Sequence, residues 1–352
     1  MLLLKIIIFL LILLQTAMPV FCQEEPKESA NSETEEQYAP AAAVPLPVYV
    51  AGLPNINDYN IFANSGWDGN WYIGYNVCWI KKLPPIPNGT LGNYSKAYIG
   101  AKIGRAKTRR KLNKPIWEKE PIPGDIYVAI ASTPAWRSST RYYLASTQDI
   151  PLESDSDNAL EGVSESRWFW TEIPLSQVSM DGLNYLAIWS PTEYFVNSAT
   201  SPILCGGWGA KGNETSAWIN DEIKGTPPIE PEKSIKTGIT VFEPALVLKL
   251  IPADTIRELQ INITDIKEGK KGTQNKTVFV FITSNEIERT YLQVSIDNKT
   301  WKKVGRITYS PPWIFTIDPD QLPGGKIFIR AICEDIWMNQ GTSVPIELLV
   351  QK

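Results

Sequence analysis

The sequence predicts an all-β protein built as two β-sandwich domains. No long helical periodicity runs through residues 44–252. Short alternating runs of apolar and polar residues instead recur between glycine, proline and asparagine, and many short strands separated by turn signals are typical of sandwiches and barrels. A length of 352 residues suits about two domains with flanking segments.

Residues 1–22 have the pattern of a secretory signal peptide. Lys5 precedes nine consecutive apolar residues that end at Leu14, whereas a membrane-spanning helix needs about 20. Cleavage is expected after Cys22. Two alternatives stay open: an uncleaved membrane anchor, because the apolar character extends to Val20, and lipidation of Cys22. We expect an exported protein in the periplasm, at the cell surface or outside the cell.

Residues 23–43 are predicted to form a disordered acidic linker. They contain six glutamates and one lysine with little apolar mass, and such segments stay extended through self-repulsion. Because this linker carries −5 and residues 1–22 carry +1, the net charge of −4 leaves 0 for residues 44–352. A neutral body gives no reason to expect nucleic-acid binding.

The first domain is predicted over residues 44–252. Ten of the 13 tryptophans lie between Trp67 and Trp218, a density that fits broad sheet surfaces and also fits a protein that stacks on sugars. Strand-like alternation occurs at 70–80, 97–103, 125–131, 167–173, 184–189 and 240–250.

Three of these pieces carry a resemblance. The successive strands "GDIYVAI", "WFWTEIPL" and "DGLNYLAIWS" resemble, in their order, the jelly-roll modules found on exported proteins and beside glycan-active enzymes. The resemblance covers residues 124–190. It implies that the first domain is a jelly-roll-like β-sandwich.

The second domain is predicted over residues 253–352. About seven short strands in about 100 residues match the size of an immunoglobulin-type sandwich. The pieces "VSIDNKTWKKVG", "PPWIFTIDPDQLPGGKIFIRAICEDIWMN" and "SVPIELLV" resemble the bacterial Ig-like domains of surface proteins. That resemblance implies an Ig-like fold with a spacing, adhesive or supporting role and no chemistry of its own.

Aromatic side chains in predicted loops of the first domain are the candidate ligand-binding residues. Sugar rings present C–H faces that stack on exposed aromatic rings. Core packing is the alternative, and we expect it for Trp168, Trp170 and Trp189, which lie within predicted strands. The candidates are Trp136, Tyr142, Tyr143 and Trp208, with Trp218 in the same aromatic set.

An acidic loop is the candidate metal site. Its alternating carboxylates have the rhythm of calcium loops, although Asn158 stands where an EF-hand needs glycine. A solvated acidic loop is the alternative. No cofactor is expected to be required, and a structural Ca²⁺ in this loop stays open. The candidate ligands are Asp149, Glu153, Asp155 and Asp157.

A basic run lies in the first domain and contains no aromatic residue. Seven cationic side chains within 13 residues suit an anionic polymer such as an acidic envelope polysaccharide. A solvated loop or a protected sheet edge is the alternative. The seven are Lys102, Arg105, Lys107, Arg109, Arg110, Lys111 and Lys114.

Three cysteines remain after the predicted cleavage. Cys78 and Cys205 lie in the same Trp-rich region, so an oxidising compartment would allow a disulfide between them. Two buried thiols that act as small apolar side chains are the alternative. Cys333 is expected to be a buried thiol.

The chain contains no histidine. This excludes Ser-His-Asp and Cys-His nucleophiles, histidine metal sites and histidine proton shuttles. We therefore expect no catalytic residues and no enzyme activity, but an exported binding protein. Its first domain would bind a carbohydrate or envelope polymer, and its Ig-like domain would act as a spacer.

Two other functions stay open. The chain could be a structural or protein-interaction subunit of an envelope assembly, held through sheet edges and aromatic patches. It could also be a glycosidase, which needs only two carboxylates. The expected partners are a glycan, an envelope polymer or another envelope protein, with no nucleic acid and no membrane contact beyond the signal segment or an N-terminal anchor. The acids available to a glycosidase are Glu118, Glu120, Glu172 and Glu193.

Overall fold

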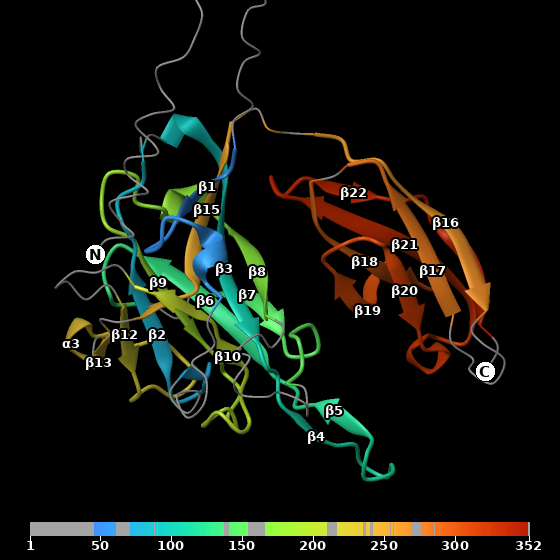
Figure 1. The fold of residues 1–352 in the computed structure, drawn as a ribbon, viewed down its shortest axis with the longest axis horizontal. Coiled ribbons are helices and arrows are strands. Elements are labelled where there is room, and N and C mark those ends of the chain that lie inside the picture. The colour runs from blue at the N-terminus through green and yellow to red at the C-terminus, as the bar shows by residue number, and fades with distance from the viewer. Residues whose placement is uncertain are drawn as a thin grey trace, which may run out of the picture. The chain divides into compact units, whose positions relative to one another are not determined.

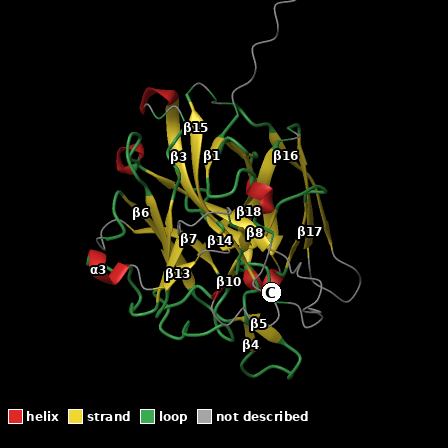
Figure 2. Cartoon of the chain, turned by 60° about the vertical axis from the view of Figure 1, so that its left-hand side comes forward, coloured by secondary structure: helices red, strands yellow, loops and turns green. Residues whose placement is uncertain are grey.

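The computed structural model describes residues 46–60, 71–87, 89, 91–136, 141–153, 166–209, 217–234, 237–239, 242–253, 255, 257–268, 276–284 and 286–350. They belong to one compact unit, Pro45–Lys352. The predicted signal peptide and acidic linker lie outside these residues. The all-β class is confirmed, because antiparallel strands dominate and the helical turns among the described residues are three or four residues long (Figures 1 and 2).

The first sandwich consists of two sheets that enclose the main core. The five-stranded sheet has the order β1-β15-β3-β10, with β8 also paired to β3. Its strands are β1 (Val48–Val50), β3 (Tyr94–Gly104), β8 (Ser166–Ile173), β10 (Ile203–Leu204) and β15 (Leu246–Pro252). The six-stranded sheet has the order β13-β12-β2-β9-β6-β7. Its strands are β2 (Cys78–Lys82), β6 (Asp125–Ala131), β7 (Arg141–Ser146), β9 (Tyr185–Trp189), β12 (Ala217–Asn220) and β13 (Thr237–Ile239).

The six-stranded sheet is apolar on both faces. On β6, Ile126, Val128 and Ile130 enter the main core, while Ala129 faces the other way, as the two-residue period of a strand requires. The far face carries a second group of buried side chains, which we call the outer cluster. Its members are Cys78, Ile80, Ala129, Trp136, Ala187, Trp189 and Ile223.

Two small sheets complete the first sandwich and matter for the sites below. The strand β11 (Gly206–Trp208) pairs with β14 (Phe242–Pro244). The strand β4 (Thr108–Arg110) pairs with β5 (Lys119–Pro121) to form a hairpin. Single helical turns are η1 (Ile56–Asp58), η2 (Leu91–Asn93), η4 (Leu175–Gln177) and α3 (Pro231–Ser234).

Residues 261–350 form the second group of sheets. A three-stranded sheet, β16-β17-β20, and a five-stranded sheet, β19-β18-β21-β22 with β23 on β21, share one apolar core. The strands are β16 (Ile261–Glu268), β17 (Lys276–Ile282), β18 (Ile287–Ser295), β19 (Lys302–Thr308), β20 (Ile314–Ile317), β21 (Gly325–Asp335), β22 (Gln340–Thr342) and β23 (Ile346–Val350), with the turn η5 (Pro319–Gln321). The Ig-like resemblance and the predicted boundary after residue 252 stay predictions.

Lys249 joins the two groups of sheets within the compact unit. This β15 side chain is fully buried, and its Nζ lies 2.9 Å from Glu288 Oε2 on β18. The same nitrogen lies 4.9 Å from the ring centre of Trp170, and the Trp170 indole also donates to Glu288. Burial lowers the pKa of Lys249, while the carboxylate of Glu288 opposes that shift.

The predicted disulfide between Cys78 and Cys205 is wrong. Both side chains, and that of Cys333, are buried free thiols. Cys78 belongs to the outer cluster and Cys205 to the main core, so the six-stranded sheet separates them. Burial raises the pKa of Cys205 to about 12 and that of Cys333 to about 11, and it also raises the pKa of Cys78. The alternative prediction of buried thiols is confirmed.

One finding concerns membranes directly. Among the described residues, none of the helices is long and apolar enough to cross a bilayer.

Candidate functional sites

The indole of Trp208 is a solvent-facing aromatic surface held from below. Trp208 ends β11, and 66% of its surface is exposed. Its ring packs on Phe242 of the paired strand, with centroids 4.8 Å apart. Phe242 in turn packs edge-on against Trp71 at 5.9 Å, and Trp71 lies 4.6 Å from the core residue Trp79. We call Trp208 and Phe242 the Trp208 ledge.

Two glycines allow the ledge to sit close to the body of the domain. A Cβ on Gly207 would lie 2.3 Å from Leu53 Cδ1 and 2.8 Å from the backbone oxygen of Asp58. A Cβ on Gly206 would lie 2.8 Å from the ring of Trp71. Strand β11 therefore fits only with glycines here, and its close packing fixes the position of Trp208.

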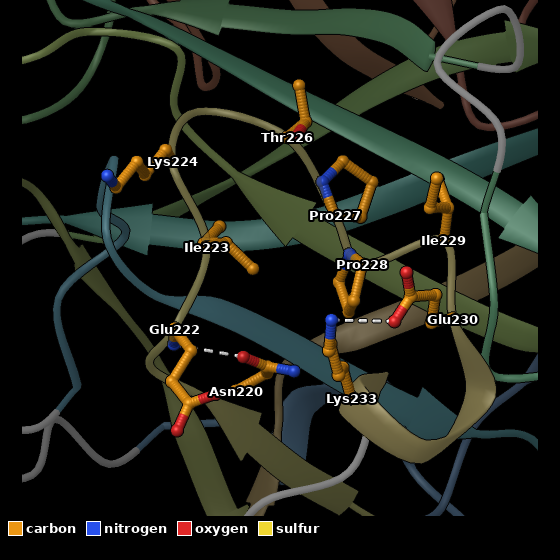
Figure 3. A pocket seen from close by; sticks show the side chains of 10 residues that line it. All are labelled: Asn220, Glu222, Ile223, Lys224, Thr226, Pro227, Pro228, Ile229, Glu230 and Lys233. Carbon is orange, nitrogen blue, oxygen red and sulfur yellow. Dashed lines mark hydrogen bonds and ion pairs between the residues drawn. The ribbon is translucent and has the colours of Figure 1, made fainter.

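A pocket of about 330 Å³ lies beyond the end of β12, where the chain crosses the outer face of the six-stranded sheet (Figure 3). All of its lining residues come from one stretch of the chain, 220–233. Its apolar lining is Ile223, Pro227, Pro228 and Ile229, and its polar lining is Asn220, Glu222, Lys224, Thr226, Glu230 and Lys233.

Asn220 places an unpartnered donor in this pocket. Its side chain is 1% exposed, and its Oδ1 accepts a hydrogen bond from the backbone N–H of Glu222 at 3.0 Å. The oxygen is thereby assigned, so the buried nitrogen without a partner is Nδ2. Figure 3 shows this nitrogen turned toward Lys233. A buried donor without a partner costs about 1–3 kcal/mol, a cost that a ligand oxygen would remove.

The pocket wall is attached to the outer cluster by two hydrogen bonds. The backbone N–H of Trp136 donates to the oxygen of Pro228 at 2.9 Å. The indole nitrogen of Trp189 donates to the oxygen of Gly225 at 2.8 Å. Lys233 Nζ lies 2.7 Å from Glu230 Oε2, which holds these two side chains together at the rim. The pocket is thus a fixed part of the fold.

The predicted role of Trp136 in ligand binding is wrong. Trp136 is 1% exposed and belongs to the outer cluster, so neither face of its ring is open to a sugar. Its neighbours in the sequence indicate a loop, and the loop does form. That loop folds back over the apolar outer face of the six-stranded sheet, and Trp136 covers it.

The remaining aromatic candidates lie on three separate strands: β7 and β12 of the six-stranded sheet, which are not neighbours, and β11 of a two-stranded sheet. Tyr142 is half-buried and Tyr143 is 48% exposed, both on the edge strand β7. The ring of Tyr143 meets Tyr127 edge-on at 5.8 Å, and its pKa is raised to about 12, mainly by burial. Trp218 is half-buried on β12. The structure therefore does not gather the predicted residues into one site, and Trp208 is the exposed tryptophan among them.

The described half of the acidic loop is engaged with lysines. Asp149 pairs with Lys303, and Glu153 pairs with Lys107. Asp155 and Asp157 lie outside the described residues. Within the described part of the chain, no group of three acidic or sulfur ligands is close enough to hold a metal ion. The calcium site stays a prediction.

The basic run divides into two parts. Lys102 donates to the backbone oxygen of Tyr59 at 2.7 Å, and Arg105 and Lys107 are buried. These three side chains serve the fold. The other four, Arg109, Arg110, Lys111 and Lys114, are exposed on the β4–β5 hairpin.

Sequence reasoning missed the two carboxylates that share the pocket, Glu222 and Glu230. Of the acids it did consider, Glu172 accepts from the Tyr98 hydroxyl at 3.3 Å and Glu120 pairs with Arg109 at 2.9 Å. The one local feature of the sequence that indicates a rigid pocket wall is the pair of neighbouring prolines, Pro227 and Pro228. Nothing local indicated that this wall would meet Trp136.

Comparisons with known proteins find similarity to solved structures, among them the two that follow. No family model and no curated protein matches the chain. It matches the glycoside hydrolase domain of Endo-D from Streptococcus pneumoniae R6 at 8% identity and a TM-score of 0.25, over 77% of this chain and 32% of that one. It matches a β-1,2-glucanase from Parabacteroides distasonis at 13% identity and a TM-score of 0.23, over 83% and 39%. The chain thus spans less than two fifths of either structure.

The prediction that this chain is not an enzyme is contradicted: the two structures described are a glycoside hydrolase domain and a β-1,2-glucanase. The prediction rested on the absence of histidine. That absence excludes nothing in this reaction class, since glycoside hydrolysis uses a pair of carboxylates. At such TM-scores no residue role or substrate passes from those proteins to this chain.

Proposed function

We propose that this chain binds carbohydrate and that the Trp208 ledge is the contact surface. The observation that carries this proposal is the exposed indole of Trp208, held 4.8 Å from the ring of Phe242. The C–H face of a sugar ring stacks well on such a surface. Because the indole is already fixed from below, it loses little freedom when a ligand covers it.

An open ledge suits the middle of a long chain, whereas a closed pocket suits a chain end. The expected ligand is therefore a polysaccharide or an envelope polymer. The net charge of zero over residues 44–352 gives no general preference for an acidic or a neutral polymer.

The test is calorimetric titration of the full chain with a panel of neutral and acidic polysaccharides. Saturable binding is expected, and Trp208→Ala should weaken it about tenfold, or ~1.4 kcal/mol, the scale of one aromatic contact. Trp117→Ala is the matched control, because Trp117 is also an exposed tryptophan but lies on the β4–β5 hairpin. The proposal fails if no polysaccharide binds, or if Trp208→Ala binds as tightly as the wild type.

A second candidate function is glycoside hydrolysis in the pocket. It is favoured by the two carboxylates, Glu222 and Glu230, that line one cavity with the unpartnered Nδ2 of Asn220. One carboxyl group would protonate the leaving oxygen while the other acts as nucleophile or as base for water. The amide would hold a sugar hydroxyl.

Release of reducing ends from the same polysaccharides tests this second function. Glu222→Gln and Glu230→Gln should each lower the rate by about 10²-fold or more. Glu193→Gln, an exposed carboxylate outside the pocket, is the control. Equal rates in both pocket variants and the wild type would remove the pocket from consideration.

A further inference from the structure

The tip of the β4–β5 hairpin exposes three large apolar side chains. Leu112 is 82% exposed, Ile116 is 70% exposed and Trp117 is 77% exposed. They lie within six positions of one another between the two strands. Figure 1 shows the hairpin extending past the end of β10. Large apolar side chains exposed together at one turn indicate a site that contacts another apolar surface.

The tip has an ordered backbone. The N–H of Lys111 donates to the oxygen of Glu118 at 2.9 Å, and the N–H of Glu118 donates to the oxygen of Pro115 at 2.9 Å. Asn113 adopts a φ of 59°, a left-handed conformation that asparagine tolerates in turns. The three apolar side chains are therefore presented by a defined turn.

The base of the hairpin is tied to the protein. The N–H of Ile122 donates to the oxygen of Lys107 at 2.9 Å, and the buried Lys107 amine pairs with Glu153. Ala106 also forms an isolated parallel β-bridge with Leu152. The hairpin is an arm with a fixed base and a solvent-facing tip.

Cations surround the apolar tip. Residues 109–120 contain five cations and two carboxylates, a net charge of +3. Arg109 and Glu120 pair with each other at 2.9 Å, which leaves the excess positive charge beside the tip. The other cations are Arg110, Lys111, Lys114 and Lys119, and all four are exposed.

We propose that this hairpin docks on an anionic lipid surface. Trp117, Ile116 and Leu112 enter the boundary between headgroups and acyl chains, where tryptophan is most favourable. The surrounding lysines and arginines meet the lipid phosphates. This proposal does not depend on carbohydrate binding.

Charge complementarity and apolar exposure together select this occupant. An acidic polysaccharide would satisfy the cations but would leave Leu112 and Ile116 in water. A neutral apolar groove on a protein would cover the tip but would gain nothing from the excess positive charge. A bilayer that contains anionic lipid covers the apolar side chains and also pairs with the cations. This proposal goes beyond the expected membrane contact through the signal segment or an N-terminal anchor, since Leu112, Ile116 and Trp117 were not among the candidate site residues.

The test uses the full chain with a probe placed at the tip. An environment-sensitive fluorophore is attached to Ile116→Cys in a Cys22→Ser background, in which the three remaining thiols are buried. Val344→Cys is the control position, because Val344 is 76% exposed and lies outside the hairpin. Since the probe reports only its own surroundings, a contribution of residues 1–22 to vesicle binding does not affect the result.

Vesicles of phosphatidylglycerol and phosphatidylcholine should shift the emission of the probe at 116 to the blue and leave the probe at 344 unchanged. Changing Arg109, Arg110, Lys111 and Lys114 to glutamine should raise the lipid concentration at half-shift at least tenfold. Pure phosphatidylcholine should give a smaller shift. Salt at 0.5 M should also weaken the response, because it shortens the Debye length to about 4–5 Å and screens the attraction between the cations and the lipid phosphates. A probe at 116 that stays in water beside anionic vesicles would overturn the proposal. So would an equal shift with a soluble acidic polysaccharide.

Discussion

At the scale of single residues, Gly207 shows how tightly the candidate ledge is fitted to its support. An added Cβ would meet both a side chain, at Leu53, and the backbone oxygen of Asp58. The side chain of Leu53 can move, but the backbone of η1 cannot move without disturbing its packing against β11.

Gly207→Ala is therefore expected to lower the free energy of unfolding by about 1–3 kcal/mol, the usual range for overpacking. Gly92→Ala is the matched control, because a Cβ at Gly92 meets nothing within 4 Å and should change stability by less than about 0.5 kcal/mol. Urea unfolding of the three proteins measures both values. Equal stability of the two variants would show that β11 is loosely packed.

Single residues also show where sequence reasoning reaches its limit. Trp208 and Trp136 both follow small or loop-forming residues, and the sequence treats them alike. One became a solvent-facing ledge, and the other became the cover of the outer cluster. The difference is made by Pro228, 92 positions further along the chain, whose oxygen accepts from the N–H of Trp136. A contact of that sequence separation leaves no local pattern.

At the scale of elements, strands were predictable where one face is buried against the core. The predicted strand 125–131 coincides with β6, because Ile126, Val128 and Ile130 alternate strictly. The prediction over 70–80 is correct only for the part that becomes β2. Before it, the backbone of Ile73 and Tyr75 bonds to segments 195–202 outside any regular sheet.

The β2 strand also carries a buried lysine into the main core. Lys81 is fully buried, and its Nζ lies 2.7 Å from the Tyr59 hydroxyl, 3.0 Å from the oxygen of Pro244 and 3.4 Å from Glu243 Oε2. One amine thus joins β2 to β14 and to the loop after η1. Both of these segments support the Trp208 ledge.

Lys81→Met is expected to lower stability by about 3–5 kcal/mol, because it removes a buried cation from beside the buried carboxylate of Glu243. The double variant Lys81→Met/Glu243→Leu should recover a large part of that loss, since it removes both charges. A double-mutant cycle in urea measures the coupling. If the double variant is as unstable as the sum of the two single variants, the ion pair does not couple these elements.

At the scale of the whole molecule, burial of neutral thiols and phenols should make the protein sensitive to alkali. Each of these groups has a pKa above its ordinary value in the folded state, and desolvation is the largest cause. The groups are Cys78, Cys205, Cys333, Tyr49, Tyr98 and Tyr309.

The folded state keeps these protons at pH values where the unfolded chain has lost them. Their contribution to stability is therefore complete below about pH 9, the ordinary thiol value, and falls as the pH rises toward 11 and 12, the pKa values of Cys333 and Cys205. Lys249, whose pKa burial lowers, acts in the opposite direction, but it is a single group.

Urea unfolding at pH 8 and at pH 10.5 should show a lower midpoint at the higher pH. Cys205→Ala removes one of the responsible thiols, so its midpoint should fall less between the two pH values. A midpoint that is independent of pH over this range would mean that these side chains reach solvent in the native state.

For the molecule as a whole, the architecture was predictable from the sequence, whereas the functional sites were not. Alternation alone was sufficient for an all-β sandwich, because a two-residue period allows few other solutions. The pocket depends on residues 220–233 crossing the outer face, and the hairpin tip depends on which of seven cations turn outward. Both are outcomes of tertiary packing, and neither has a sequence motif.

The unbonded state of Cys78 and Cys205 has a practical side. Folding of the described residues therefore requires no oxidant to form a sulfur–sulfur bond. The protein should fold equally well under reducing and oxidising conditions, and dithiothreitol should leave its melting temperature unchanged.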